Sequence, residues 1–365
     1  MADFRDLVTL DDLEKYAATH LDKNASDYYS TGSGDDVSLH ENRQAFKRLK
    51  LRPRMLRNVA EQDISVTVLG QKLSMPICVS PTAFQAMAHP DGELATVRAV
   101  NSMDTAMGLS IYSTYSLEDV ARESPNTIKF MQMQFYTDRQ LMVEVLKRAE
   151  KAGFKAVLLT VDIPVYGQHR KRANFFLPEH LKFANFLSLK KKKGLRNNRE
   201  LNKYISDTAD SSVDWETFDW LRSTTSLPFV VKGILTAEDA HLAVQHGAQG
   251  IMVSNHGGRQ LDCVPATIEA LPEIVEAVRG TGVEVYMDGG VRLGTDALKA
   301  LALRARAVFV GRPVIWGLTY KGEQGVFEVL QMLRDELKVA MALSGCASLK
   351  DITPSLVTRH TASHL

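Results

Sequence analysis

The chain has 365 residues, of which 45% are hydrophobic and 24% charged; this composition is typical of a globular protein and excludes a disordered or fibrous one. Its formal net charge of +1 provides no global field that would attract nucleic acid. No run approaches the roughly 20 apolar residues needed to span a bilayer, and the acidic first twenty residues do not resemble a secretory signal. The cysteines, Cys78, Cys263 and Cys346, are odd in number and widely spaced, which favours a reducing compartment. We therefore expect a soluble protein with neither a nucleic-acid nor a membrane partner.

The predicted elements begin with a helical segment and continue with alternating strands and helices. Residues 1–70 contain helical patterns over Leu10–Leu21 and Leu39–Leu49. Eight runs rich in β-branched residues follow, each ahead of a turn and a stretch of helical spacing: 75–83, 106–113, 127–135, 155–162, 228–234, 250–256, 284–290 and 307–313. Capping signals at Ser116, Thr137 and Thr236 mark helix starts between the runs.

Eight strand–helix units predict a closed (β/α)8 TIM barrel over residues 71–345, within a single domain spanning 1–365. We expect the N-terminal helices to cap the underside of the barrel and to reach toward its mouth. An open doubly wound sheet is the alternative, but no Gly-x-Gly-x-x-Gly follows the first strand to support it.

A long connection, residues 163–214, interrupts the pattern after the fourth strand and contains the lysine run 190–193. Loops this long are usually functional lids or disordered. A lysine run is most often only solvated, and attraction to an anionic surface or acidic substrates is the alternative. Residues 346–365 form the C-terminal tail. Its end, Ser363-His364-Leu365, is close to the Ser-Lys-Leu address of the peroxisomal import receptor, and a frayed polar tail is the alternative.

The sequence from Ser254 to Asp262 places a histidine and an arginine just after the apolar run Gly250–Val253. His256 can accept a proton near neutral pH, and Arg259 can bind a carboxylate through two parallel hydrogen bonds. The pair suggests a small 2-hydroxy acid as substrate. The alternative is an ordinary turn at a strand end.

Polar residues also end the other predicted strands, where the active sites of such barrels lie. They are Thr82, Ser110, Gln132, Thr160, Asp162, Lys232, Asp288 and Arg312. Because buried polar groups need partners, this set predicts a ligand rich in hydrogen-bonding groups, and it suits the edge of a flavin ring. An ammonium at Lys232 would stabilise a ring that gains electrons.

Two glycine-bearing turns follow the last two strands, at 288–292 and 311–313. Barrels commonly bind phosphate at this place, through glycine N–H groups and a helix N-terminus. Arg292 and Arg312 would add charge-assisted hydrogen bonds. No cluster in the sequence has the spacing of a metal site.

These motifs together resemble the flavin-dependent 2-hydroxy acid oxidases, and the resemblance covers nearly the whole chain. The matching segments include 27–29, 52–56, 81–83, 160–162, 231–233, 254–260, 288–292 and 311–313. Among relatives, the animal peroxisomal hydroxyacid oxidases, glycolate oxidase especially, look most similar.

The resemblance implies that His256 is the base, oriented by Asp162, and that Arg259 and Tyr28 bind the substrate carboxylate. It implies FMN as cofactor, O2 as electron acceptor with release of H2O2, a peroxisomal location with cytoplasm as the alternative, and a homotetramer or larger homo-oligomer. The residues implied to hold FMN are Thr82, Ala83, Ser110, Gln132, Thr160, Lys232, Ser254, Asp288, Gly290, Arg292, Gly311 and Arg312.

The chain departs from the family pattern near the expected substrate. Gln134 stands where the family usually has tyrosine, Tyr112 where it has tryptophan or another aromatic residue, and His169 where it has arginine, although Arg170 can slide into that place. We expect these positions to set selectivity. Three hypotheses follow: an oxidase for a glycolate-like acid, a dehydrogenase for longer or aromatic acids or another acceptor, and a catalytically weak flavin-binding relative.

Overall fold

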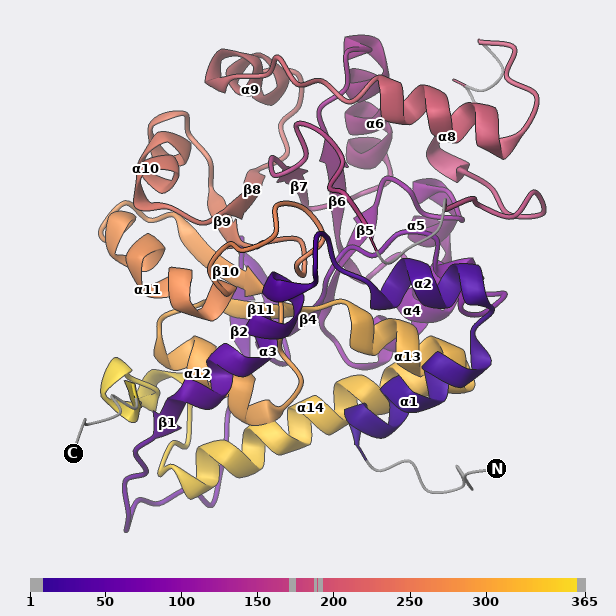
Figure 1. Cartoon of the computed structure of the whole chain (residues 1–365). Coiled ribbons are helices and arrows are strands. Elements are labelled where there is room, and N and C mark those ends of the chain that lie inside the picture. Colours follow the sequence, from indigo (N-terminus) through magenta and orange to yellow (C-terminus); the bar gives the residue numbers. More distant parts are fainter. Residues whose placement is uncertain (1–8, 171–174, 187–188, 190–192, 360–365) are drawn as a thin grey trace.

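A closed barrel of eight parallel strands forms the centre of the molecule, which confirms the predicted fold class. The computed structural model describes residues 9–170, 175–186, 189 and 193–359 (Figure 1). The barrel strands are β4 (Ile77–Val79), β5 (Ala106–Ser110), β6 (Ile128–Gln134), β7 (Ala156–Thr160), β8 (Phe229–Ile234), β9 (Gly250–Val253), β10 (Glu284–Asp288) and β11 (Ala307–Val310). They are shorter than the sequence predicts, so several expected strand-end residues lie in the loops just beyond.

Helices surround the barrel and connect its strands (Figure 1). They are α4 (Gly92–Ser102), α5 (Leu117–Glu123), α6 (Arg139–Lys151), α9 (Trp215–Arg222), α10 (Ala237–Gln245), α11 (Thr267–Ala277), α12 (Gly294–Ala302), α13 (Arg312–Lys321) and α14 (Glu323–Leu343). Ser116 and Thr236 cap α5 and α10 as predicted. The prediction for Thr137 is wrong by one residue, because the carboxylate of Asp138 accepts the Leu141 N–H and caps α6.

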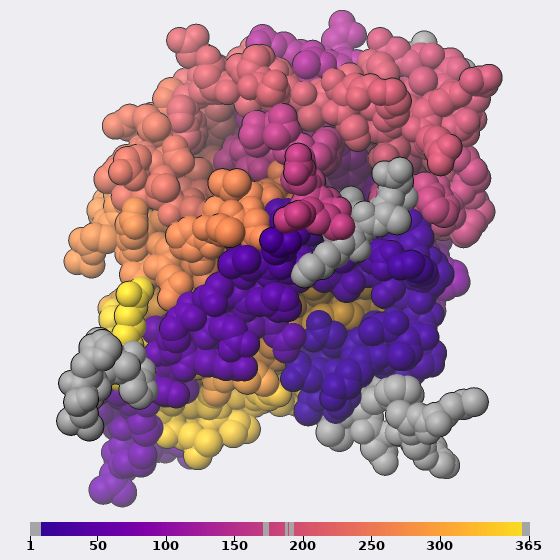
Figure 2. Space-filling model, in the orientation of Figure 1, coloured from indigo at the N-terminus to yellow at the C-terminus, as the bar shows by residue number. Residues whose placement is uncertain are grey.

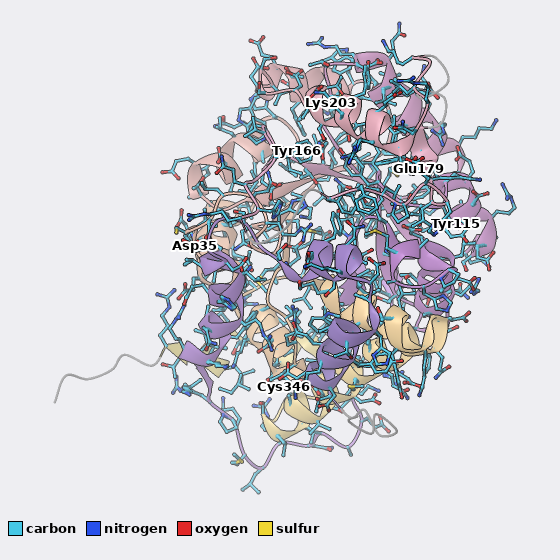
Figure 3. The ribbon with its side chains drawn as sticks, turned by 45° about the vertical axis from the view of Figure 1, so that its right-hand side comes forward. Asp35, Tyr115, Tyr166, Glu179, Lys203 and Cys346 are labelled. Carbon is cyan, nitrogen blue, oxygen red and sulfur yellow. The ribbon has the colours of Figure 1, made fainter. Side chains whose placement is uncertain are left out.

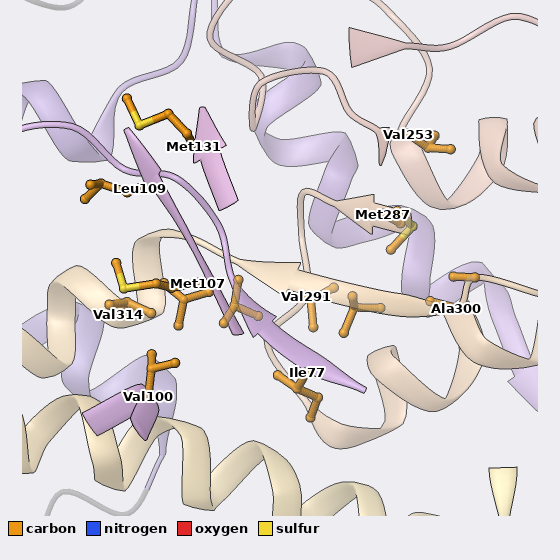
Figure 4. Close-up of a cluster of buried hydrophobic side chains, with 14 of the residues drawn as sticks. Ile77, Val100, Met107, Leu109, Met131, Val253, Met287, Val291, Ala300 and Val314 are labelled. Atoms are coloured by element: carbon orange, nitrogen blue, oxygen red, sulfur yellow. The ribbon is translucent and has the colours of Figure 1, made fainter. Parts of the chain in front are cut away.

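Alternation along the strands divides the core into two layers. One set of side chains, including Ile77, Met107 and Met287, points outward and packs against helical residues such as Val100 and Val314 (Figure 4). The other set, including Phe130 and Leu158, fills the barrel interior. Because every second side chain of a strand points to the same face, the interior face can be followed to the mouth of the barrel. It ends there with Ser80, Ser110, Gln132, Gln134, Thr160, Lys232 and Asp288. This explains how one buried face changes from apolar to polar.

The N-terminal segment covers the mouth and side of the barrel, and the prediction that its helices cap the underside is wrong. Its helices are α1 (Leu10–His20), α2 (Lys23–Ser30), which was not predicted separately, and α3 (Val37–Arg48). Figure 2 shows this indigo segment lying across the near face, and α1 packs against α13. The hairpin of β2 (Val66–Val68) and β3 (Gln71–Leu73) packs into the interior core instead, because its buried valine and leucine side chains meet the inward side chains of the barrel strands.

The C-terminal tail is attached to the N-terminal segment. β12 (Val357–Arg359) pairs antiparallel with β1 (Leu49–Leu51), after the short 3-10 turns η3 (Leu349–Asp351) and η4 (Pro354–Leu356). The predicted import signal, residues 363–365, lies outside the described residues.

The connection after β7 contains η2 (Ala184–Phe186) and α8 (Asn198–Asp207), and aromatic packing holds it over the mouth. Phe175 stacks on Phe84 with ring centroids 5.4 Å apart, and Phe186 stacks on Tyr112 at 5.6 Å. Asn185 is fully buried and bonds the loop after β5. This part of the predicted lid is therefore packed structure. Of the lysine run, only Lys193 is described, and its ammonium lies over the Tyr204 ring.

Within the ranges given above, no helix is both apolar enough and long enough to cross a membrane.

Candidate active site

A cavity of about 450 Å³ opens at the carboxyl ends of the barrel strands, between the N-terminal segment and the connection after β7. Most residues singled out from the sequence line it: Tyr28, Thr82, Ala83, Ser110, Tyr112, Gln132, Gln134, Thr160, His169, Lys232, His256, Arg259, Asp288, Gly290, Arg292, Gly311 and Arg312. Asp162 and Ser254 lie behind this lining, in contact with His256 or Lys232. Arg170 lies elsewhere.

His256 is held by Asp162 at one side of the cavity. The His256 Nδ1 atom lies 3.0 Å from Asp162 Oδ1, and the Asp162 side chain is only 12% exposed. Burial alone would raise the pKa of the Asp162 carboxyl, but the hydrogen-bonded imidazole of His256 and the ammonium of Lys232 hold that pKa below its ordinary value. The carboxylate therefore stays ionised and orients the imidazole, with the other ring nitrogen available to the cavity.

The loop that carries His256 is bent sharply. His256, Gly257 and Gly258 all have positive φ, and such a conformation in a histidine costs on the order of 1–3 kcal/mol. A Cβ at Gly258 would collide with the backbone of α3, and the Asn255 side chain exchanges two hydrogen bonds with Asn42 of that helix. The close approach of α3 therefore fixes the strained loop.

Lys232 lies on the interior face of β8, near the mouth of the barrel, between two polar partners. Its ammonium donates to Ser254 Oγ at 2.9 Å and lies 3.3 Å from Asp288 Oδ2. Ser80, which the sequence reasoning missed, donates to the same Asp288 oxygen at 3.0 Å. The Lys232 side chain is 4% exposed, so its charge acts in a poorly solvated site, where it is strong.

A second group of polar side chains lines the floor next to Lys232. Gln132 donates to Thr160 Oγ1 at 3.0 Å and accepts from the Ile111 N–H. Ser110 Oγ accepts from the Tyr112 N–H. These groups come from β5, β6 and β7, which are neighbours in the barrel. They form a continuous polar edge suited to a flat heteroaromatic ligand.

The opposite end of the cavity is built for an anion. Burial lowers the pKa of Arg292 to about 10, and burial together with the neighbouring cations Arg259 and Arg292 lowers that of Arg312 to about 9. Arg312 bonds to the carbonyl oxygens of Tyr29, Gly257 and Thr31, and no carboxylate among the described residues pairs with it. Gly311 precedes α13 without a side-chain cap. Pro313 has no N–H and the Val314 N–H donates to the Gly311 carbonyl, so the N–H groups of Gly311 and Arg312 are those that remain for a ligand in this turn.

Arg259 is positioned by the end of α2. Its Nη1 atom donates to the carbonyl oxygen of Tyr28 at 2.6 Å, and its guanidinium lies 4.8 Å from the centre of the Tyr28 ring. Among the described residues no carboxylate pairs with Arg259. The fork is therefore held in place with one edge available for a substrate carboxylate.

The two candidates for a second arginine separate in space. His169 lines the cavity, with Nδ1 2.7 Å from the carbonyl oxygen of Gly32. Arg170 instead points into solvent and pairs with Asp35 at 3.1 Å, both side chains being about two-thirds exposed at 66% and 68%. The hypothesis that Arg170 slides into the cavity is not supported, because the backbone pairing of His169 with Gly34 fixes which side chain faces inward.

Sequence reasoning missed several cavity residues because they come from the irregular connection after β7. Tyr166 and Phe175 line the cavity, as do Asn202 and Ser206, which lie one turn apart on α8. Gln260 donates to the carbonyl oxygens of Asp162 and Val165 and so attaches this connection to the histidine loop. The spacing of Asn202 and Ser206, four residues apart, is the sequence signal that places both on one face of a helix.

A model of the FMN-dependent dehydrogenase family matches residues 17–359. The chain belongs to this family. It is 53% identical to 2-hydroxyacid oxidase 1 of Mus musculus over 97% of each chain, and 49% identical to glycolate oxidase of Spinacia oleracea over 96% of this chain and 95% of that protein. A mandelate oxidase solved with (S)-4-hydroxymandelic acid superposes with a TM-score of 0.88 at 39% identity, covering 96% of this chain and 98% of the other.

FMN is the cofactor of this family, and the cavity fits it. Two buried atoms, Asp288 Oδ1 beside Lys232 and Arg292 Nε at the anion end, have no hydrogen-bond partner among the described residues. A ligand that carries hydroxyl groups and a phosphate satisfies both, and the polar edge from Ser110 to Thr160 suits its ring. Among the described residues no group of three or more His, Cys, Asp and Glu side chains could hold a metal ion.

Proposed function

We propose that the protein oxidises a small 2-hydroxy acid of the glycolate type to the 2-oxo acid, with O2 as electron acceptor and H2O2 as product. The observation that carries the proposal is the arrangement at one side of an FMN-sized cavity. There the hydrogen-bonded His256 and Asp162 lie together with the Arg259 guanidinium, which can bind a carboxylate. Similarity to 2-hydroxyacid oxidase 1 and to glycolate oxidase supports it.

In this proposal Arg259 and Tyr28 bind the substrate carboxylate, which places the 2-hydroxyl group near His256. His256 accepts one of the two hydrogens that the substrate loses, as a proton, and Asp162 stabilises the resulting imidazolium. Phe175 and the connection after β7 exclude water from this side of the cavity. When bound, FMN would supply the acceptor for the two electrons and the second hydrogen of the substrate, and O2 would take up the two electrons with two protons to give H2O2.

The residues proposed to hold FMN fall into three groups. Arg292, Arg312 and the N–H groups of Gly290 and Gly311 would bind the phosphate. Ser80 and Asp288 would bind the ribityl hydroxyls. The ring would be held by Thr82, Ala83, Ser110, Gln132, Thr160 and Lys232, and Ser254 accepts a hydrogen bond from Lys232 behind the cavity lining.

Anaerobic mixing with glycolate tests the function. We expect the yellow protein to bleach without oxygen and to recolour when oxygen is admitted. Bleaching without recolouring would favour a dehydrogenase with another acceptor, and an inert yellow protein would favour a catalytically weak relative. The H256A variant should keep its colour and lose turnover; substantial oxidation by that variant would contradict the role of His256.

A longer or aromatic substrate is a second candidate, because structures of mandelate oxidase superpose closely on this chain. Comparing kcat/KM for glycolate and (S)-mandelate decides between them.

We also propose a peroxisomal location and a homotetramer. Support for the location is the sequence Ser363-His364-Leu365, and deletion of these three residues should leave a fluorescent fusion in the cytosol. Support for the oligomer is an exposed apolar patch formed by Met55 and Leu56 beside Leu343 of α14. Light scattering of the purified protein measures its mass directly.

A further inference from the structure

Three phenols and one amide form a hydrogen-bonded chain, and three of its members, Tyr112, Gln134 and Tyr166, line the cavity wall that extends from the side opposite His256. Tyr136 OH donates to Tyr112 OH at 2.9 Å, Tyr112 OH lies 2.6 Å from Tyr166 OH, and Gln134 Nε2 donates to Tyr166 OH at 3.1 Å. Tyr112 follows β5, which is four strands from β9 in the closed barrel of eight and hence opposite it. Figure 3 labels Tyr166 on the same side of the molecule as Lys203 of α8.

The wall has hydrogen-bonding groups that its own residues leave unused. The Tyr136 proton is used toward Tyr112, and one proton is shared between Tyr112 and Tyr166. One phenolic O–H of the latter pair is therefore left over, and both of these side chains line the cavity. Gln134 Oε1 is buried and has no hydrogen-bond partner among the described residues. The wall thus presents one donor and one acceptor to the cavity.

The phenols act as donors at neutral pH. Burial, helped by the neighbouring phenols, raises the pKa of Tyr112 well above its ordinary value, and burial does the same at Tyr136. Burial also raises the pKa of Tyr166. All three therefore stay protonated. The buried Gln134 oxygen, left without a partner beside an unused phenolic O–H, weakens the binding of any ligand that puts an apolar group against it.

A hydroxyl group is the smallest substituent that matches this wall, because it accepts from a phenol and donates to an amide oxygen. In the proposed function, which this step assumes, Arg259 holds the carboxylate and His256 faces the 2-carbon. The remaining substituent then points across the cavity. We infer that the wall of Tyr112, Tyr166 and Gln134 binds a hydroxyl on carbon 3, so the enzyme selects 2,3-dihydroxy acids over acids with an apolar group at that carbon.

The test compares (S)-glycerate with (S)-lactate, which differ only in that hydroxyl. In the FMN-loaded protein we expect kcat/KM for glycerate to exceed that for lactate by about 5- to 150-fold, the range for one satisfied pair of buried groups. Gln134→Met removes the acceptor at similar size and should bring the ratio near unity, and the double variant Y112F/Y166F should lower it as well. Gln324→Met, an exposed change on α14, is the matched control and should keep the ratio.

A binding measurement separates this inference from the proposed function. In the H256A variant, calorimetric titration gives the Kd of each acid without turnover, and glycerate should bind at least about fivefold more tightly. A smaller preference there, or one that survives Gln134→Met, overturns the inference whether or not the protein is an oxidase. Oxidation of glycolate by the parent enzyme tests the function separately. Tyr115→Phe, whose hydroxyl bonds the Pro90 carbonyl outside the cavity, checks that loss of any phenol is not the cause (Figure 3).

Discussion

Replacing Asp162 with asparagine tests the central element of the proposed mechanism. The carboxylate accepts from His256 Nδ1 at 3.0 Å, and the side chain is 12% exposed, so solvent screens the pair only weakly. Asparagine can keep a neutral hydrogen bond through its oxygen. A bond to a charged group contributes about 1.5–3 kcal/mol and a neutral one about 0.5–1.5 kcal/mol, so the variant loses roughly 1–2 kcal/mol of imidazolium stabilisation. Because 1.36 kcal/mol of activation free energy corresponds to a tenfold change in rate constant, substrate oxidation should slow about 5- to 30-fold.

Stopped-flow bleaching of the FMN-loaded protein under anaerobic conditions measures this loss. The limiting rate should fall, whereas the substrate concentration for half-maximal rate should change little, because Arg259 and not Asp162 binds the carboxylate. A control variant, Asp335→Asn, removes a carboxylate from an exposed pair on α14 and should match the parent. If the D162N variant bleaches within about twofold of the parent rate, Asp162 does not assist His256.

Three other predictions concern the cofactor and the fold. Arg292→Met should weaken FMN binding about 10- to 150-fold in a fluorescence titration, since it removes bonds to a charged phosphate. Unchanged affinity would place the phosphate elsewhere, and Arg334→Met, a partly exposed change on α14 remote from the cavity lining, is the control. Gly290→Ala should lower the Tm, because the added methyl group collides with α3 and the φ angle of this residue is +81°. Gly311→Ala should keep the Tm and weaken FMN binding, because its added methyl group meets only ordinary contacts. Equal losses of Tm in the two variants would contradict this. The pKa of Asp162 is lowered below its ordinary 3.8 on folding, so its stabilisation is complete above that pH and lost as the pH falls through the folded value. The Tm gap between parent and D162N should accordingly narrow as the pH falls below 3.8, and a constant gap would refute the linkage.

Local sequence patterns were sufficient to predict the barrel and most of its polar mouth. Strand spacing and alternation are local properties, so eight apolar runs predict eight parallel strands, and the residue two positions beyond Phe130 or Leu158 must share their interior face. That periodicity places Gln132, Thr160 and Lys232 at one edge without any knowledge of the fold. Capping at Ser116 and Thr236 is equally local.

Contacts between distant segments determine which further residues complete the site. The choice between His169 and Arg170 depends on a backbone pairing with Gly34, 135 positions away, that no local pattern encodes. Tyr166 enters the cavity because aromatic packing on Phe84 and Tyr112 holds an irregular connection in place. The underside is closed by a hairpin and not by the N-terminal helices. In each case the deciding energy comes from contacts between segments far apart in the chain, whereas sequence patterns report only on neighbours.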